Sequence, residues 1–396
     1  MKELYSHIAS HPLTYITRDR ERALGLDPET SGYSIISNND DLRNEHTSVL
    51  GTRDLLQHES VQRAIPPGSA VLLFKNTLSF ERMIAEHGWT LLNPSARLSN
   101  TVEEKISQIT WLGELNSYLP PTHISLCKDL LWSGESYIVQ FNHAHSGEGT
   151  LLISSSDDVT SLQDKFPERP VRVTQYVDGE MFTVNAVVHS SGIMVSSPSY
   201  QITGITPFTD GAFTTIGNDW GYADTTLNAE QKQYIKTLAT EIGAKLQRDG
   251  WKGLFGLDIM RETSTGKMYL IEINARQPAS TTYESYIQQN TLREDTMIST
   301  FEAHLSTLLD IPLDGYELTP VTTRAQILQR ITSDRQTVSP ETITALEALR
   351  CTVLPYDNTE LGSELLRIQT YDSLVQSHKV LSTLGAQIKD VLLSNI

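Results

Sequence analysis

Three oxygen-bearing side chains fall close together between residues 255 and 280. Asp258 lies in one apolar run, and Glu272 and Asn274 lie at the end of a second. The turn-forming residues Thr263–Gly266 separate the runs, so we expect two antiparallel strands joined by a tight turn. Glu272 and Asn274, two residues apart, would share one face of their strand. Two carboxylates and an amide at one place predict a Mg²⁺ site, because Mg²⁺ prefers hard oxygen ligands.

Arg276 continues the same spacing, two residues after Asn274. Its guanidinium is planar and always charged, so it would place a rigid donor beside the metal. Buried hairpins with one or two acidic residues are common, so the chemistry of this hairpin depends on what the rest of the chain supplies.

The composition describes an ordinary globular protein and argues against several functions. The chain has 396 residues, of which 39% are hydrophobic and 20% charged, and this length predicts two to four domains. A formal net charge of −17 argues against nucleic acid and anionic membranes as partners. Only two cysteines occur, Cys127 and Cys351, which predicts no disulfide framework. We see no apolar signal core and no membrane-spanning run, so we expect a cytoplasmic protein.

Residues 1–100 predict a small parallel α/β unit. Apolar strand candidates lie at 33–37, 70–74 and 90–92, and a helix is expected over 79–87. Alternation of strands and helices favours a parallel sheet. No GxGxxG follows these strands, so we expect a structural or substrate-side role rather than dinucleotide binding.

A long amphipathic helix is predicted over 101–119. Thr101 and Glu104 would form its capping box, and Lys105 would lie in its first turn. A cation is disfavoured there by the helix dipole, so a solvated lysine is the plain interpretation from this stretch alone.

Four further helices are predicted after residue 220. Two have apolar stripes over 228–248 and 296–309, and the last is expected over 374–393. Shorter elements follow Pro312, including a helix that begins near Pro340. Residues 311–396 therefore predict a small α+β appendage, either a dimer surface or a lid.

A strand over 137–141 leads into a loop that contains Gly147 and Gly149. Glycines let backbone N–H groups approach a phosphate closely, although a hairpin turn explains them equally well. The loop histidines, His143 and His145, have no third ligand nearby and are more typical of a polar loop than of a metal site.

Two β-like runs, 171–175 and 181–189, flank the segment 176–180. An apolar slot beside such a segment could hold an adenine, and a pair of edge strands with an Asp-Gly turn is the alternative. The irregular stretch 196–223 would approach a substrate through Gln201, Thr214 and Thr215.

The order of these features resembles the ATP-grasp superfamily, which includes D-alanine–D-alanine ligase, biotin carboxylase and many carboxylate–amine ligases. The resemblance covers about residues 101–310, and Asp258 followed by Glu272-x-Asn274-x-Arg276 is its most specific part. It implies an α/β and α+β protein with an ATP-grasp fold, in which two α+β lobes grip the nucleotide.

The implied domains are a pre-ATP-grasp unit (1–100), a glycine-loop lobe (101–175), a metal-binding lobe (176–310) and the appendage.

The resemblance also assigns roles to residues. Asp258, Glu272 and Asn274 would bind Mg²⁺, or Mn²⁺ in its place, and Arg276 would be catalytic by orienting a carboxylate or stabilising the transferred phosphoryl group. The implied nucleotide-binding residues are Lys105, Gln140, Gly147, Glu148, Gly149, Gln175, Tyr176, Val177 and Glu180.

Three positions depart from the family pattern. Gln140 stands where a lysine usually reaches the phosphates, and Gln175 and Met181 stand where acidic residues are common. Glu180 is then a substitute for the ribose contact. Because Gln140 carries no charge, we expect one of three outcomes: another cation replaces the missing positive charge, phosphate binding is weaker than usual, or catalysis is lost.

The implied activity is ATP-dependent, ADP-forming ligation of a small carboxylate to an amine through an acylphosphate, with amino acids or peptides among the candidate substrates. The alternatives are a non-catalytic nucleotide-binding module and a ligase with a thiol acceptor. Whether the protein forms a homodimer is left open by the sequence.

Overall fold

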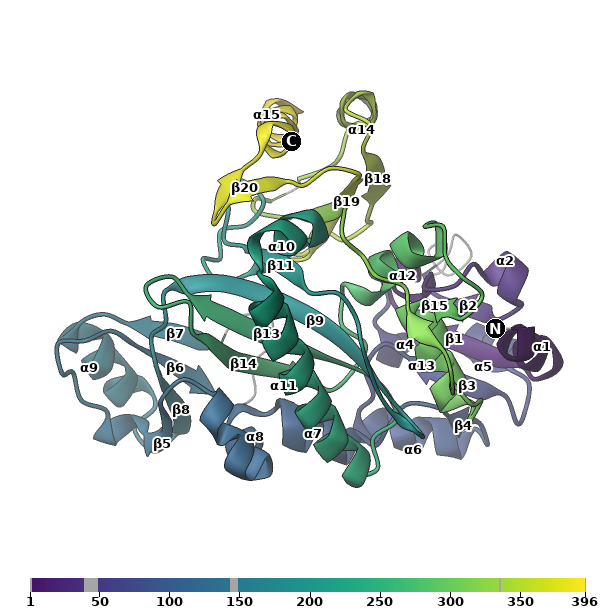
Figure 1. Ribbon diagram of the computed structural model, residues 1–396, viewed down its shortest axis with the longest axis horizontal. Coiled ribbons are helices and arrows are strands. Elements are labelled where there is room, and N and C mark those ends of the chain that lie inside the picture. Colours follow the sequence, from purple (N-terminus) through teal and green to yellow (C-terminus); the bar gives the residue numbers. More distant parts are fainter. Residues whose placement is uncertain (1, 39–48, 143–148, 335, 396) are drawn as a thin grey trace.

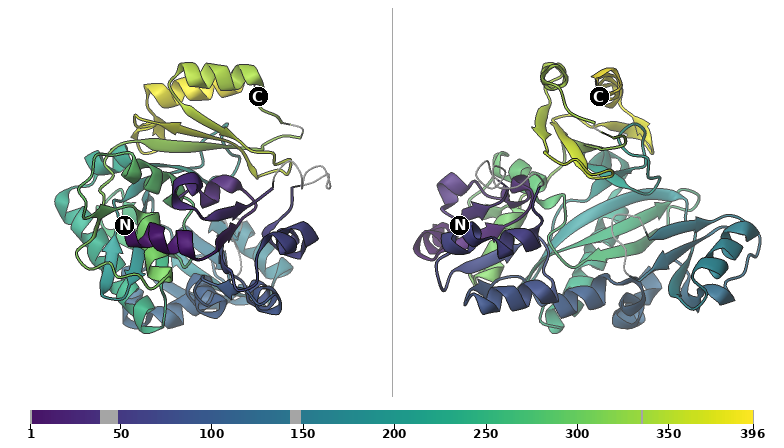
Figure 2. Two further views of the ribbon diagram at one scale, coloured as in Figure 1. Left: turned by 90° about the vertical axis from the view of Figure 1, so that its right-hand side faces the viewer. Right: turned by 180° about the vertical axis from the view of Figure 1, so that it is seen from behind.

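The computed structural model describes residues 2–38, 49–142, 149–334 and 336–395. A large antiparallel sheet lies at the centre of Figure 1, with a small sheet to its left, a parallel α/β unit to its right and two helices above it. The two views in Figure 2 show the same arrangement from the side and from behind. None of the helices in the described ranges is long and apolar enough to cross a membrane.

The N-terminal unit is a four-stranded sheet in the order β2-β1-β3-β4, and all its neighbouring strands are parallel. The predicted strands and the predicted helix are confirmed, whereas β1 was missed because its four residues carry no periodic pattern. The strands are β1 (Leu13–Ile16), β2 (Ser34–Ile36), β3 (Ala70–Leu73) and β4 (Thr90–Leu91), and the helices are α1 (Lys2–Ser10), η1 (Arg20–Ala23), α2 (Pro28–Ser31), α4 (Thr52–Gln57), α5 (Glu59–Ala64) and α6 (Leu78–Glu86).

The single helix predicted over 101–119 is wrong. The segment forms α7 (Ala96–Glu103), α8 (Lys105–Leu112) and the 3-10 helix η2 (Gly113–Tyr118), with Glu104 in an extended conformation between the first two. The side chain of Asn142 holds this break, because its Oδ1 accepts from the Ile106 N–H at 2.9 Å and its Nδ2 donates to Glu104 at 3.0 Å. The break makes Lys105 the first residue of α8.

The small sheet is antiparallel, with strand order β5-β8-β6-β7, and α9 (Ser156–Lys165) covers it. Val139, Ile153, Leu162 and Val171 belong to its own hydrophobic core, separate from that of the large sheet. The strands are β5 (Thr122–Leu126), β6 (Tyr137–Phe141), β7 (Thr150–Ile153) and β8 (Pro170–Gln175), and η3 (Cys127–Asp129) follows β5.

The large sheet runs in the order β14-β13-β9-β11-β12-β17-β19-β18, and β10 pairs with β9. Helix α11 (Ala229–Arg248) packs on one face through the predicted stripe, and Asn228 caps it as expected. The strands are β9 (Gly179–His189), β10 (Gly192–Val195), β11 (Ser199–Thr203), β12 (Thr215–Asp219), β13 (Gly253–Glu262), β14 (Met268–Asn274), β17 (Ala325–Arg330), β18 (Thr352–Pro355) and β19 (Glu364–Thr370), and α10 (Trp220–Thr226) follows β12.

The C-terminal region extends this sheet, because β17 pairs with β12 and is followed by β19 and β18. Helix α14 (Pro340–Ala348) begins as predicted, and it lies beside α15 (Thr383–Asn395) above the sheet (Figure 1). The helix predicted over 374–393 is wrong in its first half, which forms the hairpin β20 (Val375–Ser377) and β21 (Val380–Leu381). Asp219 holds this hairpin by accepting from the Leu374 and Val375 N–H groups at 2.7 and 3.2 Å.

The domain limits at residues 100 and 310 stay predictions.

Helix α13 (Thr300–Leu308) is shorter than the predicted 296–309, since β15 (Met297–Ile298) pairs with β16 (Glu317–Leu318) just before it. Helix α12 (Thr281–Gln289) lies beside α13. Phe301 and Leu305 of α13 share a hydrophobic core with Leu4 and Tyr15 of the N-terminal unit.

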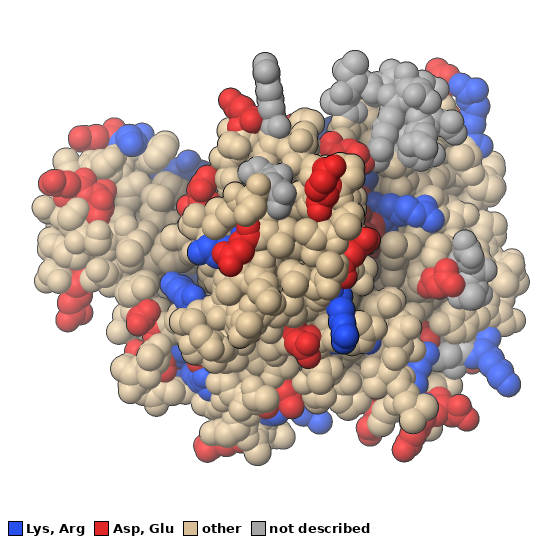
Figure 3. Space-filling model, turned by 90° about the horizontal axis from the view of Figure 1, so that it is seen from above, with Lys and Arg blue, Asp and Glu red and all other residues tan. Residues whose placement is uncertain are grey.

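Acidic and basic side chains are interspersed on the upper face of the molecule (Figure 3). This mixing differs from the interior cavity described below, where cationic side chains gather.

Replacing Phe301 by alanine tests the core that α13 shares with the N-terminal unit. The ring is fully buried, and Gly25 packs so closely on it that a Cβ there would lie 2.3 Å away. We expect Phe301→Ala to lower the unfolding free energy by about 3–5 kcal/mol, measured by chemical denaturation. Leu292→Ala is the control, because Leu292 is fully exposed and its loss should change stability by less than about 0.5 kcal/mol. An equal effect of the two variants would contradict a shared core.

Candidate active site

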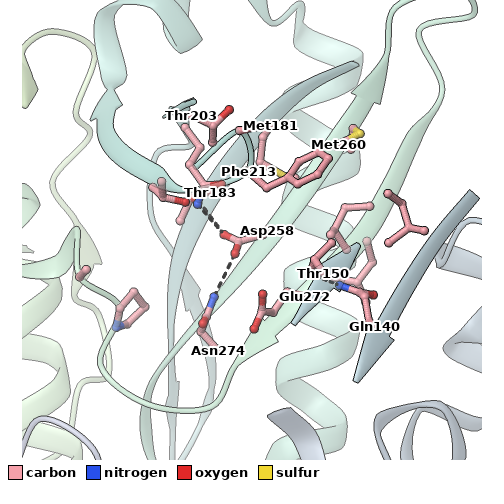
Figure 4. A pocket seen from close by; sticks show the side chains of 18 of the residues that line it. Gln140, Thr150, Met181, Thr183, Thr203, Phe213, Asp258, Met260, Glu272 and Asn274 are labelled. Atoms are coloured by element: carbon pink, nitrogen blue, oxygen red, sulfur yellow. Dashed lines mark hydrogen bonds between the residues drawn. The ribbon is translucent and has the colours of Figure 1, made fainter. Parts of the chain in front are cut away.

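A cavity of about 430 Å³ opens between the small sheet and the large sheet, a size typical of small-molecule sites. Its walls come from every part of the chain. The N-terminal unit contributes Arg22 and Phe74, the small sheet Gln140 and Arg172, and the C-terminal region Arg330, Arg367 and Lys379. The β13–β14 hairpin supplies Asp258, Glu272 and Asn274, which Figure 4 shows close together on one wall.

The hairpin forms as the sequence predicts and brings the three oxygen-bearing side chains together. Asp258 pairs directly with Glu272 across the two strands, so both side chains lie on one face. The Asn274 amide nitrogen donates to Asp258 Oδ2 at 3.2 Å, and Thr183 of β9 donates to Oδ1 at 2.7 Å. Because Asn274 donates through its NH₂ group, its carbonyl oxygen is left as an acceptor. This set of hard oxygen donors fits Mg²⁺.

Lys105 faces this hairpin from the N-terminus of α8. Its Nζ lies 2.8 Å from Glu272 Oε1, and the side chain is buried, so the solvated lysine expected from the local sequence is wrong. Burial lowers the pKa of Lys105, against the attraction of Glu272. Burial alone would raise the pKa of Glu272, but Lys105, Arg276 and Arg172 outweigh it and lower that pKa.

Asp258 has the opposite shift. Burial, reinforced by the Glu272 charge, raises its pKa to about 6, although Thr183 and Asn274 donate hydrogen bonds to it. Two neighbouring carboxylates therefore differ in protonation behaviour, because Lys105 pairs directly with Glu272 and is only a minor influence on Asp258.

Arg276 lines the cavity beside the hairpin and is anchored from behind. Its Nη1 forms an ion pair with Glu103 at the end of α7, and Glu103 Oε2 in turn lies 2.9 Å from Lys75 Nζ. This chain of contacts fixes the guanidinium, and the pKa of Arg276 is raised because the Glu103 and Glu272 charges outweigh desolvation.

Most of the predicted nucleotide-binding residues that lie in the described ranges reach the cavity. Lys105, Gln140, Gly149, Gln175, Tyr176 and Val177 all line it. Gly147 and Glu148, like the loop histidines at 143 and 145, lie outside the described residues. Of the candidate substrate-facing residues, Gln201 and Thr215 line the cavity, whereas Thr214 is not part of its wall as far as the chain is described.

The structure places Glu180 away from the cavity, which corrects its assignment as a ribose contact. Successive side chains of a strand point to opposite faces, and Met181 and Thr183 of β9 are the ones that line the cavity. The Glu180 carboxylate instead accepts from Arg261 and from the Tyr222 hydroxyl, the latter at 2.6 Å. It belongs to a polar cluster on the other face of the sheet.

One part of the wall is apolar. Ile138, Val177, Met181, Met260 and Leu270 line it beside the segment that joins the two sheets, and Figure 4 shows Met181 and Met260 near Phe213. This lining has the character that a purine ring requires.

Another part of the wall gathers three arginines around one carboxylate. Glu364 forms ion pairs with Arg22 and, at 3.3 Å, with Arg367. Arg330 donates to the carbonyl oxygens of Gly362 and Thr215, at 2.9 and 3.1 Å. Burial opposes ionisation of Glu364, but the three guanidinium groups lower its pKa to about 2. This end of the cavity is therefore cationic.

Sequence reasoning missed these arginines and Arg172. The sequence held a signal for two of them, since Arg172 lies between Val171 and Val173 and Arg367 lies between Leu366 and Ile368. Arg22 and Arg330 carry no local signal, because only tertiary packing brings them to the cavity.

The sequence of residues 102–280 matches the ATP-grasp domain family. This region is an ATP-grasp domain. Several solved structures resemble this chain in fold, and the likeness covers almost the full length of both chains. It therefore includes the regions on either side of the ATP-grasp domain. The predicted ATP-grasp fold with a parallel N-terminal sheet is confirmed. No curated protein sequence matches the chain.

Three of these structures illustrate which proteins share the fold and how similar they are to this chain. Carboxyaminoimidazole ribonucleotide synthase from Aspergillus clavatus, solved with ATP, is 14% identical with a TM-score of 0.68, covering 98% of this chain and 99% of that one. N5-carboxyaminoimidazole synthetase from Staphylococcus aureus, solved with ADP, is 10% identical with a TM-score of 0.64, covering 97% of each chain. Phosphoribosylamine–glycine ligase from Thermotoga maritima is 12% identical with a TM-score of 0.64, covering 96% of each. At these identities the likeness concerns the fold.

The raised pKa of Asp258 makes a prediction about stability. Between pH 3.8, its ordinary value, and about 6, the folded state holds this proton more tightly than the unfolded state, so the Asp258 charge costs stability as the pH rises through that window. We expect Asp258→Asn to be more stable than the parent at pH 7.5, by on the order of 1–2 kcal/mol, and to lose this advantage below pH 4.

Thermal melts at the two pH values measure this effect without any ligand. Asp295→Asn is the matched control, because Asp295 is exposed and its replacement should give no pH-dependent gain. A variant at Asp258 that is less stable than the parent at pH 7.5 would show that its hydrogen bonds, and not its desolvation, dominate.

Proposed function

We propose that this protein is an ATP-dependent ligase that activates a small carboxylate as an acylphosphate and couples it to an amine, releasing ADP and phosphate. The observation that carries the proposal is the convergence of Asp258, Glu272 and Asn274 with Lys105 and Arg276 on one cavity. Structures of this fold that were solved in complex with ATP and with ADP support nucleotide binding.

The nucleotide would lie between the two sheets. Its base would lie against the apolar wall of Ile138, Val177 and Met181, and main-chain groups of 176–177 would bind its polar edge. Its phosphates would then face Lys105 and Gly149. In this arrangement, the segment Gln175–Val177 would contact the base through its backbone rather than through its side chains.

The donor set of the hairpin fits a divalent cation. Asp258, Glu272 and the Asn274 carbonyl oxygen would hold it, and Mn²⁺ suits the same ligands. Bound Mg²⁺ supplies neutralisation of the phosphate oxygens during phosphoryl transfer. Lys105 would leave part of its pairing with Glu272 to contact the phosphates, since an ammonium group has three donors.

The chain's own residues do the positioning. Arg276, held by Glu103, would orient the substrate carboxylate, so that an attack on the γ-phosphate needs little further ordering. The same guanidinium would stabilise the charge of the transferring phosphoryl group. Enclosure between the two sheets would limit access of water to the acylphosphate.

The cationic end of the cavity suggests the chemical class of one substrate. Arg22, Arg330 and Arg367 gather around the Glu364 carboxylate there, so among the described residues the guanidinium groups outnumber the carboxylates that pair directly with them. A substrate that carries an additional carboxylate or phosphate group would balance this charge. We therefore expect acidic substrates, such as dicarboxylic amino acids or phosphorylated amines, to be preferred over neutral ones.

Release of ADP and phosphate from mixtures of acids and amines tests the activity. Under such an assay, Glu272→Gln should lower turnover at least roughly 100-fold, because it removes a metal-binding charge while the side chain keeps its shape. Glu230→Gln on the exposed side of α11 is the control and should keep full activity. Full activity of Glu272→Gln would remove Glu272 from the metal site, and ATP binding without release of ADP would favour the non-catalytic module.

Arg276→Lys tests the need for a planar donor. A lysine keeps the charge but cannot form two parallel hydrogen bonds, so we expect the KM of the carboxylate substrate to rise and kcat to fall, together by on the order of 10- to 100-fold in kcat/KM. Arg248→Lys, an exposed substitution at the end of α11, should leave both parameters unchanged. An unchanged response to the carboxylate would make Arg276 a structural residue.

A further inference from the structure

Arg172 of β8 is a buried arginine in the cavity wall, with 3% of its surface exposed. Its Nε and Nη2 donate to Gln140 Oε1 on the neighbouring strand β6, with the Nε bond at 2.9 Å. Nη1 donates to Gln108 Oε1 of α8 at 2.9 Å, and Nη2 also donates to the Ile271 carbonyl at 3.2 Å. Three elements therefore hold the guanidinium in one orientation.

All of these partners are neutral. Within the described ranges, no carboxylate oxygen lies within 4.0 Å of the guanidinium nitrogens of Arg172, so it forms no ion pair there. Lys105 and Arg276, which also line the cavity, are by contrast paired with Glu272 and Glu103. As far as the chain is described, Arg172 is thus a buried charge that has no ion-pair partner.

Such a charge is costly unless something compensates it. Desolvation lowers the pKa of Arg172 to about 10, and the attraction of Glu272 only partly offsets this. The guanidinium has five N–H groups, and the hydrogen bonds above use four of them. No acceptor in the part of the chain that the structure describes takes the second N–H of Nη1, which can therefore donate to a ligand.

We propose that Arg172 is a phosphate-binding residue, which contacts the polyphosphate group of the nucleoside triphosphate in this cavity. The proposal rests on the proposed function, because it assigns the anion to the nucleotide. The register places Arg172 directly opposite Gln140, so both side chains lie on one face of the small sheet. Gln140 itself is neutral, and its role is to position the Arg172 guanidinium.

A purely structural role is the competing explanation. Arg172 links α8, β6 and β14, so its loss could loosen the packing of the two sheets. A structural role predicts that every ligand of the cavity binds more weakly. A phosphate contact predicts that only phosphorylated ligands do so.

The test compares binding of ATP and adenosine to the full-length protein by calorimetry. For Arg172→Gln we expect the Kd of ATP to rise on the order of 10- to 100-fold, while the Kd of adenosine changes less than about twofold. Arg248→Gln is the control, because Arg248 is exposed at the end of α11 and is not among the described residues that line the cavity. It should bind both ligands as the parent does.

A second variant keeps Arg172 in place and carries the test if Arg172→Gln does not fold. Gln108 lies behind the guanidinium and does not line the cavity, so Gln108→Glu would neutralise Arg172 without touching the ligand. We expect it to weaken ATP and spare adenosine.

Unchanged ATP affinity in either folded variant, or an equal loss of ATP and adenosine, would overturn the proposal. Failure of the unaltered protein to bind ATP would instead overturn the proposed function.

Discussion

The ion pair between Lys105 and Glu272 is the contact on which the arrangement of the cavity depends. It joins the first residue of α8 to Glu272 of β14 in the wall of the cavity. A buried lysine needs a carboxylate partner, and a carboxylate beside Asp258 needs a cation to stay ionised. Each residue therefore makes the burial of the other tolerable, and neither could occupy its place alone.

The same contact explains why the backbone departs from a regular helix. A continuous helix through Glu104 would carry Lys105 past the position where it meets Glu272. The extended conformation of Glu104, held by the Asn142 side chain, ends α7 and begins α8 at the residue that must face the hairpin. Local sequence favours the longer helix, and a tertiary hydrogen bond decides against it.

What could be predicted from the sequence follows from this distinction. The β13–β14 hairpin was predictable because its turn residues, apolar runs and two-residue spacing are all local. Helix α11 was predictable for the same reason, through its cap and its stripe. The break at Glu104, the β20–β21 hairpin and the cationic end of the cavity were not, because distant residues such as Asn142 and Asp219 create them. Glu180 was misplaced because strand alternation fixes its face only once Met181 is known to line the cavity.

The continuity of the large sheet has a consequence for how this chain can be divided. Strand β12 is hydrogen-bonded to β17, so cutting the chain near residue 310 would leave β12 as an open edge with unpaired N–H and C=O groups. The excised fragment would also lose the arginines that line one end of the cavity, and an exposed strand of this kind invites self-association. Gene fusions or truncated forms of this protein should therefore keep β17–β19 together with the rest of the large sheet.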